Sequence, residues 1–418
     1  MAKILFLPYA EQLGSTYPLI DLAKHFVEKG DEVVFAGEGQ FMKLVEASNY
    51  ATEKLIEVPY ALYDSHLSRG SGGFHTYETA KKHIKAELEL YQKVRPDLII
   101  AQNRPTSRLS AEIAKIKHVS VIVAMATKYR GNSIHKAESF TYAPIFKIPL
   151  LGRVFSKYAD QLIEVVARTW LRPYNKIAKE YNIKPLQSFF DLLEGNLMTL
   201  IPESASIFPL KEGYPSDNYF YIGPQLTRRH FDPPHWYNEA KERDGIFIYL
   251  SMGSTAHKLY PIVFKRLVEI FGDKKGITIV TNTSWIMDGE KEHISTPSNI
   301  YVANITPAEI MFELADVTVC HGGNGTIYHS LLFGVPVVGI TERVEHEMNM
   351  EKIKELNLGD YVLFNKFQKL SDQKIYDLIM NVIKDKKIKE NVFEYGKKIN
   401  EEMTHVDNLV DYIRGKIQ

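Results

Sequence analysis

The run HGGNG at residues 321–325 combines one histidine with three glycines at a spacing that suits an anion site. It follows an apolar run at residues 317–320. Residues 327–333 suit a short helix, and residues 335–340 have the composition of a second strand. The first N–H groups of a helix lack partners and carry a partial positive charge, and glycine lets an anion approach the backbone closely. We therefore expect the backbone to hold a diphosphate here without a metal ion, with His321 adding a donor or a positive charge.

This stretch resembles the donor-binding signature of family 1 glycosyltransferases, which include the UDP-glycosyltransferases and macrolide glycosyltransferases. The family pattern runs H-G-G-x-G-T, then E, then G-V-P, then P-x-x-x-D-Q-x-x-N. Its matches in this chain are His321, Gly322, Gly323, Gly325, Thr326, Gly334, Val335, Pro336 and Asn349. The spacing is not that of a P-loop, because no G-K-[ST] follows the glycines. The resemblance implies an α/β protein of the GT-B fold, in which two doubly wound Rossmann-like domains face a cleft.

Other segments extend the resemblance over most of the chain. Residues 13–23, LGSTYPLIDLA, are similar to the family's G-H-x-x-P-x-L-x-L-A, and residues 249–254, YLSMGS, to its S-x-G-S loop. Residues 307–316 align with the W-x-P-Q stretch that leads to the donor motif. The resemblance implies that the acceptor binds the N-terminal domain and the nucleotide sugar binds the C-terminal domain.

Apolar runs that alternate with helical patterns predict two similar halves built from parallel βαβ units. The strand candidates are residues 4–8, 32–36, 97–101, 119–124, 246–251, 277–281 and 299–303. Helical patterns end near residue 28, begin near residue 261 and dominate residues 142–181. We expect an acceptor-binding domain at residues 1–225, a polar linker at 226–245, a nucleotide-sugar-binding domain at 246–399, and a helix within 400–418 that crosses back to the first domain.

Composition limits the possible classes of function. The chain has 418 residues, enough for two domains, and carries 51 basic and 51 acidic residues, so nothing draws it electrostatically to nucleic acid. The single Cys320 excludes an internal disulfide and a cysteine-based metal site, and fits a reducing compartment. No room for a signal peptide precedes the first strand, and no apolar run has transmembrane length. We expect a soluble, cytoplasmic protein.

The resemblance also assigns donor-binding residues, several of which depart from the family pattern. The assigned residues are Ser254, Ile305, Pro307, His321, Gly322, Gly323, Asn324, Gly325, Thr326, His329, Glu345 and His346. Ile305 takes the place of the Trp that stacks on the base, and His329 that of the ribose-binding Glu. Glu345 and His346 stand for D-Q, so a carboxylate for sugar hydroxyls is kept, whereas His346 could alter which sugar fits. The default donor is a UDP-sugar, and the sugar stays open.

The usual catalytic His–Asp dyad is replaced. The His position is Ser15 and the Asp position is Gln102, and neither side chain titrates near neutral pH. Glu11, in the same loop as Ser15, is one candidate base, and His75, at the end of a glycine-rich segment at residues 68–75, is another. Alternatively, the acceptor is already anionic and needs no base.

These residues predict an inverting, metal-independent glycosyltransferase that moves a hexosyl group from a nucleotide diphosphate sugar to a small, partly apolar acceptor. No D-x-D or H-E-x-x-H motif suggests a metal site, and we expect no cofactor beyond the nucleotide-sugar co-substrate. The alternatives are a catalytically degenerate homologue that binds nucleotide sugar or partners an active transferase, and a nucleotide-sugar epimerase, which the donor motif disfavours. Residues 142–153 could line a lipophilic acceptor pocket or touch a membrane surface, although core packing is favoured over membrane contact.

Overall fold

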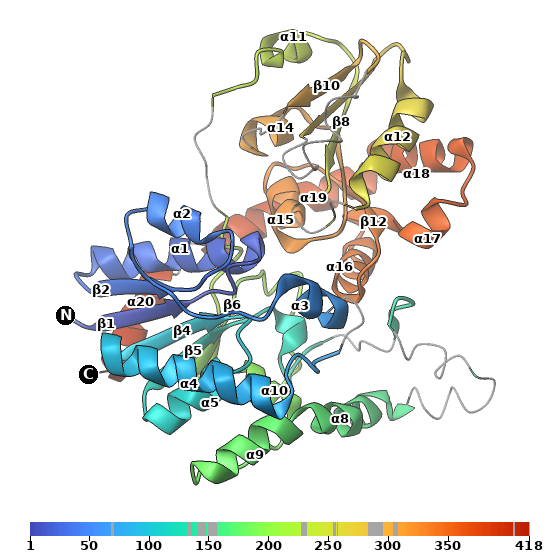
Figure 1. Ribbon diagram of the computed structural model, residues 1–418. Coiled ribbons are helices and arrows are strands. Elements are labelled where there is room, and N and C mark those ends of the chain that lie inside the picture. Colours follow the sequence, from blue (N-terminus) through green and yellow to red (C-terminus); the bar gives the residue numbers. More distant parts are fainter. Residues whose placement is uncertain are drawn as a thin grey trace. The chain divides into compact units, whose positions relative to one another are not determined.

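The computed structural model describes residues 1–67, 71–131, 136–140, 148, 157–226, 232–253, 256, 258–282, 296–303, 308–403 and 406–417. The chain forms two compact units (Figure 1). The first comprises residues 1–227 together with 402–418, and the second comprises residues 228–401. Each unit is an α/β structure built on one parallel sheet. Among the described residues, no helix is long and apolar enough to cross a membrane.

The N-terminal unit contains a seven-stranded sheet in the order β3-β2-β1-β4-β5-β6-β7, with every neighbouring pair parallel. The strands are β1 (Lys3–Leu7), β2 (Glu32–Ala36), β3 (Ala51–Glu53), β4 (Leu98–Gln102), β5 (Lys117–Val121), β6 (Met198–Ile201) and β7 (Tyr219–Tyr221). Its helices are α1 (Leu13–Glu28), α2 (Met42–Ala47), α3 (Tyr60–Leu67), α4 (Tyr77–Val94), α5 (Ser107–Ala114), α8 (Ala159–Trp170), α9 (Arg172–Glu180), α10 (Phe189–Leu193) and α20 (Val406–Ile417), with a 3₁₀ turn at Ala124–Ala126.

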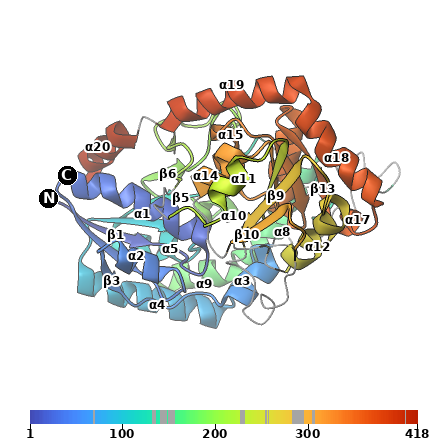
Figure 2. The same ribbon diagram turned by 90° about the horizontal axis from the view of Figure 1, so that it is seen from above.

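Both faces of this sheet are covered, because side chains alternate along each strand. Ile4 and Phe6 of β1 pack in one core with α1 and α20, whereas Leu5 and Leu7 pack in the opposite core with α4 and α5. Figure 2 shows α20 beside α1, near both chain termini. Arg414 of α20 also forms an ion pair with the buried Asp31, with 2.9 Å between Nε and Oδ2. The last helix of the chain is therefore part of the N-terminal unit.

The C-terminal unit contains a six-stranded parallel sheet in the order β10-β9-β8-β11-β12-β13. The strands are β8 (Ile246–Ser251), β9 (Ile277–Asn282), β10 (Ile300–Ala303), β11 (Val317–Cys320), β12 (Val337–Thr341) and β13 (Gly359–Leu363). Its helices are α11 (Tyr237–Lys241), α12 (Tyr260–Phe271), α14 (Ala308–Leu314), α15 (Asn324–Leu332), α16 (Val344–Glu355), α17 (Phe364–Phe367), α18 (Asp372–Lys384) and α19 (Lys386–Glu402).

Strand order fixes where a ligand would bind in each unit. In the first sheet, successive strands extend to one side of β1 up to β3, and the chain then continues on the other side from β4. The second sheet has the same reversal between β8 and β11. In open parallel sheets, ligands bind beyond the carboxyl ends of the strands at this reversal, where the two flanking loops diverge. The loop after β1 carries Glu11 and leads to Ser15 in the first turn of α1, and the loop after β4 carries Asn103. In the second sheet, Gly253 follows β8, and the HGGNG run follows β11 and enters α15. The two Rossmann-like sheets expected from the sequence are confirmed.

Several elements have the predicted bounds, namely β2, β8 and β11, and others differ by one to three residues. The predicted helix at residues 327–333 begins at Asn324 instead, because Gly323 takes the N-cap position in an extended conformation (φ −77°, ψ 141°). No strand was predicted at β3, β6, β7 or β13. Trp236 and Ala240, within the expected linker, pack in a core of the C-terminal unit. Of residues 142–153, only 148 is described.

Candidate active site

The HGGNG run makes a tight turn between β11 and α15. Gly322 has φ +94°, and a Cβ there would lie 2.8 Å from the carbonyl oxygen of His346, so the position needs glycine. The Nδ2 of Asn349 donates to the Gly322 carbonyl at 3.0 Å. Asn349, which the family pattern matched without assigning a role, therefore holds the turn in place.

The start of α15 supplies backbone donors beside this turn. Its first intrahelical hydrogen bond runs from the Ile327 N–H to the Gly323 carbonyl, at 3.1 Å. The N–H groups of Asn324, Gly325 and Thr326 therefore precede the helical ladder, and they lie at the positive end of the helix dipole. A Cβ on Gly325 would meet no atom within 4 Å, so the space beside the first turn is open.

His321 is enclosed by two glycines. A Cβ at Gly253 would lie 2.4 Å from its Cε1, and one at Gly323 would lie 2.4 Å from its Nε2. Burial lowers the pKa of His321 to about 3, and the nearby Arg343 acts in the same direction. Its Nδ1 has no hydrogen-bond partner among the described residues. Of the two roles left open by the sequence, the structure favours a neutral donor or acceptor over a permanent cation.

The start of α16 carries Arg343 at its N-cap and Glu345 and His346 in its first turn. Burial raises the pKa of the Glu345 carboxyl, and Arg343 partly opposes this. The His346 ring meets the His321 ring edge-to-face, with 4.5 Å between ring centroids. Burial, then His321 and Arg343, hold the pKa of His346 well below its usual range. This edge of the sheet therefore combines two neutral imidazoles with the guanidinium of Arg343 and the carboxyl group of Glu345, and the buried Glu347 lies in the same helical turn.

His329 lies one turn into α15. Its Nδ1 is 2.8 Å from the Gly325 carbonyl, and its ring stacks on Phe312 at 5.8 Å between centroids. A carbonyl only accepts, so Nδ1 carries the proton, and Nε2 is an acceptor while the ring is neutral. Such an atom could accept a hydrogen bond from one ribose hydroxyl. The other assigned donor residues, Ser254, Ile305 and Pro307, lie outside the described residues.

The two positions that replace the family dyad meet at the start of α1 in the N-terminal unit. The Nε2 of Gln102 donates to the Gly14 carbonyl at 3.2 Å. The Nδ2 of Asn103 donates to the Ser15 hydroxyl at 2.7 Å, and that hydroxyl donates to Oε1 of Gln12 at 3.3 Å. None of these groups titrates near neutral pH, so the arrangement orders the loop but offers no proton acceptor of suitable strength.

Two carboxylates lie close to Tyr9 at the same edge. Burial raises the pKa of Tyr9, and Tyr63, Glu57 and Glu11 add to the effect in that order. Oε1 of Glu57 accepts hydrogen bonds from the N–H groups of Glu38 (3.1 Å) and Gly39 (3.4 Å). Burial nevertheless raises the pKa of Glu57, against the effect of Arg104 and these N–H groups. Glu11 is also half-buried, in the loop after β1.

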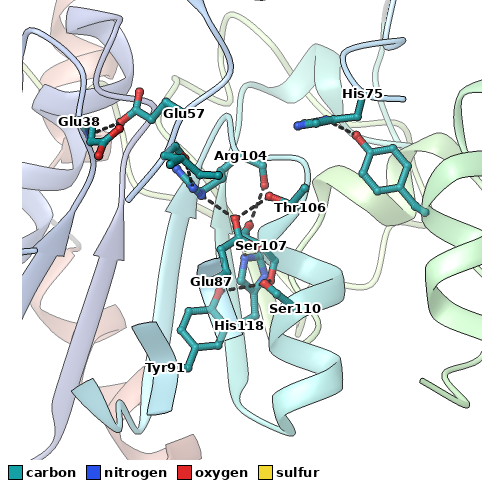
Figure 3. Close-up of polar contacts among 12 residues, drawn as sticks. Glu38, Glu57, His75, Glu87, Tyr91, Arg104, Thr106, Ser107, Ser110 and His118 are labelled. Atoms are coloured by element: carbon teal, nitrogen blue, oxygen red, sulfur yellow. Dashed lines mark hydrogen bonds and ion pairs between the residues drawn. The ribbon is translucent and has the colours of Figure 1, made fainter. Parts of the chain in front are cut away.

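His75 belongs to a buried polar cluster rather than to an open surface. Its Nδ1 is 2.7 Å from the Tyr174 hydroxyl, and burial, with His83 and Arg104 adding, lowers its pKa to about 3. Figure 3 shows Arg104 between Glu57 and Glu87, with His75 to one side. Nε of Arg104 donates to Glu87 at 2.7 Å, and both side chains are buried. A base with so low a pKa accepts a proton poorly at pH 7, so we do not assign catalysis to His75.

Comparison with known proteins finds similarity to glycosyltransferases. Residues 283–405 match the family model described as erythromycin biosynthesis protein CIII-like, C-terminal domain. The chain is 22% identical to a PGL/p-HBAD biosynthesis rhamnosyltransferase of Mycobacterium bovis, over 91% of this chain and 80% of that one. It is 23% identical to the NDP-glycosyltransferase YjiC of Bacillus subtilis, over 90% and 91% of the two chains.

Solved structures agree in fold. The glycotransferase of kitacinnamycin superposes with a TM-score of 0.73 at 17% identity, over 100% of this chain and 99% of the other. The spinosyn rhamnosyltransferase SpnG, solved with thymidine diphosphate, superposes with a TM-score of 0.71 at 13% identity, over 99% and 100% of the two chains. The chain has the GT-B fold of these glycosyltransferases.

Three polar residues near the predicted site were not singled out from the sequence. Asn103 and Arg343 each lie within two residues of a predicted position, Gln102 and Glu345, and that proximity was the available signal. No sequence pattern marks Glu57 as a site residue, because its contacts with residues 38 and 39 form only in the folded chain. Among the described residues, one group has the geometry for a metal ion, namely His25, Glu28 and Asp407 at the far end of α1, and it contains none of the predicted site residues.

Proposed function

We propose that this protein is a glycosyltransferase that takes its sugar from a nucleotide diphosphate sugar, whose diphosphate lies at the start of α15. The observation that carries this proposal is the cradle formed by Gly322, Gly323 and the first turn of α15, with His321 held against it. Backbone N–H groups at a helix start suit a diphosphate, and the neutral imidazole adds one hydrogen bond. UDP is the default nucleotide. SpnG, which shares the fold, was solved in complex with thymidine diphosphate, and this makes dTDP the alternative.

Neighbouring side chains suit the two sugars of such a donor. His329 offers Nε2 to a ribose hydroxyl, whereas Glu345 offers a carboxylate to hydroxyls of the transferred hexose. His346, which replaces the usual Gln, would influence which hexose fits. Glu345 and His346 would therefore select the transferred hexose. Two of the similar proteins are named as rhamnosyltransferases.

The proposed reaction is a direct displacement at the anomeric carbon of the sugar, in which negative charge develops on the leaving diphosphate. An acceptor oxygen forms a bond to the anomeric carbon while the bond to the diphosphate oxygen breaks, so the configuration inverts. Negative charge grows on the diphosphate, and preorganised N–H groups at the start of α15 stabilise it more in the transition state than before it. These donors take the part that a metal ion plays elsewhere, so we propose metal-independent transfer.

The acceptor is proposed to be a small, partly apolar molecule bound at the carboxyl edge of the N-terminal sheet. A neutral hydroxyl acceptor must lose its proton, and Glu11 is the proposed base. Glu57 is the other carboxylate close to Tyr9 and has a raised pKa, which makes it the competing assignment. The amide network of Ser15, Gln102 and Asn103 favours a second reading, in which the protein binds nucleotide sugar without transferring it.

Thermal unfolding with a panel of ligands tests the donor site. UDP-sugars or dTDP-sugars should stabilise the protein, because a ligand at about 100 times its Kd adds about 2.7 kcal/mol. Glu345→Gln should weaken binding of the nucleotide sugar much more than binding of the free nucleotide diphosphate. Glu342→Gln is the matched control, because Glu342 is exposed three residues earlier. Equal losses for sugar and free diphosphate would remove Glu345 from sugar recognition, and no stabilisation by any nucleotide would reject the donor site.

A further inference from the structure

Helix α8 presents an apolar stripe to solvent. Four large side chains on it are exposed, namely Tyr158 at its N-cap (48%), Leu162 (40%), Val165 (61%) and Val166 (39%). Their spacing of three, four, seven and eight residues places them on one face of the helix. Figure 1 shows α8 with α9 at the margin of the N-terminal unit. Single exposed apolar residues are ordinary, whereas a continuous stripe marks an interaction surface.

The opposite face of α8 is tied to the unit. Asp160 pairs with Arg130 at 3.1 Å and with Lys211 at 3.4 Å, and Ala159 and Ala167 are buried. A surface helix normally turns its charged side to water and its apolar side inward. In α8 the anchored Asp160 lies on the inner side and the large apolar residues on the outer, and no other described residue of the unit buries the stripe.

The exposed charged residues beside the stripe are basic, whereas the two acidic residues of α8 are the paired Asp160 and the half-buried Glu164. Lys157, Arg168 and Arg172 are all exposed. Arg168 follows Val165 by three residues, which places it along the edge of the stripe, whereas Arg172 is the first residue of the next helix, α9. Within the described part of the chain, none of these three cations forms an ion pair with an acidic side chain. The stripe therefore combines apolar surface with unneutralised positive charge.

We propose that α8 docks this protein on an anionic lipid bilayer. The helix would lie in the plane of the interface, with Leu162, Val165 and Val166 below the headgroups and the basic residues among the lipid phosphates. A stripe this short gives weak, reversible binding that anionic lipid strengthens and salt weakens. The proposal concerns a surface outside the donor and acceptor loops, so it does not rest on the proposed function.

Vesicle flotation of the full chain tests the proposal. The protein should float with phosphatidylcholine vesicles that contain phosphatidylglycerol, and much less with phosphatidylcholine alone. Combining Leu162→Ser, Val165→Ser and Val166→Ser should reduce the bound fraction by about tenfold or more, because each change removes apolar area from the interface. Phe393→Ser on α19 is the matched control, because Phe393 is 58% exposed and should leave binding unchanged.

A site-specific probe shows whether α8 itself enters the lipid. The native Cys320 is fully buried, and burial raises its thiol pKa to about 12, so a cysteine introduced at position 165 labels selectively. A polarity-sensitive dye on Val165→Cys should shift to the blue with anionic vesicles, and the same dye on Phe393→Cys should not.

Three results would overturn the proposal. The first is a folded wild type that fails to float with anionic vesicles, and the second is a triple variant that floats as well as the wild type. The third such result is a dye that responds equally at positions 165 and 393. A wild type that dimerises through the stripe, with the dimer lost in the triple variant and no vesicle binding, would assign the stripe to a second copy of the chain. Loss of flotation in the triple variant counts only if its thermal unfolding matches that of the Phe393→Ser control.

Discussion

At the scale of single residues, burial decides what the site histidines can do. His321 and His346 occupy positions where a cation beside a diphosphate would be plausible. Burial nevertheless keeps their pKa values far below 7, and Arg343 reinforces the effect. The fixed positive charge at this edge is therefore the guanidinium of Arg343. Sequence reasoning found the histidine but not its charge state, because the state depends on the glycines and on Arg343 packed around it.

His321→Ala should weaken binding of UDP or dTDP by roughly fivefold, because it removes one hydrogen-bonding group, worth about 1 kcal/mol when neutral, from the diphosphate cradle. A larger loss, with proton uptake on binding, would show that the ligand's charge protonates the imidazole. Calorimetry in two buffers with different ionisation enthalpies measures both quantities. His329→Ala should affect the nucleoside rather than the diphosphate and serves as the control. Unchanged affinity in His321→Ala would contradict the assignment.

The identity of the base is a second question at the residue scale. Glu11→Gln should lower turnover with a neutral alcohol acceptor by about 10² or more while donor affinity stays the same. Glu57→Gln is the comparison, because a glutamine can still accept the N–H bonds of residues 38 and 39. If Glu57→Gln alone abolishes transfer, the base is Glu57. If neither change matters, the acceptor reacts as an anion.

At the scale of elements, the turn between β11 and α15 depends on backbone conformation. Gly322→Ala should destabilise the C-terminal unit by about 1–3 kcal/mol and abolish nucleotide binding, because φ +94° is unfavourable for alanine and the new Cβ would press on the His346 carbonyl. Gly325→Ala is the matched control for folding, because nothing lies within 4 Å of the new Cβ. Urea unfolding compares the two, and equal stability would show that the turn tolerates a side chain.

The same turn shows what the sequence could and could not predict. Strands β8 and β11 were predictable because buried parallel strands are continuous apolar runs bounded by turn residues. The start of α15 was placed three residues late, because three glycines read as a turn, although one of them caps the helix and another lies inside it. Strands β6 and β13 were missed since MTLI and GDYVL gain strand structure from their neighbours in the sheet.

At the scale of the whole molecule, buried histidines make the N-terminal unit sensitive to acid. Burial lowers the pKa of His75 to about 3, of His83 to about 4 and of His118 to about 3. The unfolded chain, with pKa values near 6.5, binds protons first as pH falls. The stability that these three neutral histidines contribute is therefore complete above about pH 6.5. It is lost as the pH falls from there toward their pKa values in the folded protein. Each histidine contributes at most about 1.4 kcal/mol per pH unit to the slope of the unfolding free energy against pH.

Replacing one of these histidines tests that account. His118→Gln should flatten the loss of stability between pH 7 and pH 5, because one proton fewer is taken up on unfolding. Urea unfolding at the two pH values measures the difference. His235→Gln, at an exposed position, should leave the slope unchanged. A wild-type stability that does not fall between pH 7 and pH 5 would contradict the burial of neutral histidines.

The central claim is sugar transfer from a nucleotide diphosphate sugar held at the start of α15. Mass spectrometry of reactions with UDP-sugars and dTDP-sugars and a panel of partly apolar alcohols and phenols tests it most directly. We predict an acceptor product heavier by one sugar residue, released with the free nucleotide diphosphate, unaffected by a chelator and lost in Gly322→Ala. A wild-type protein that binds these donors but forms no product with any acceptor would contradict the claim and leave a nucleotide-sugar-binding protein in its place.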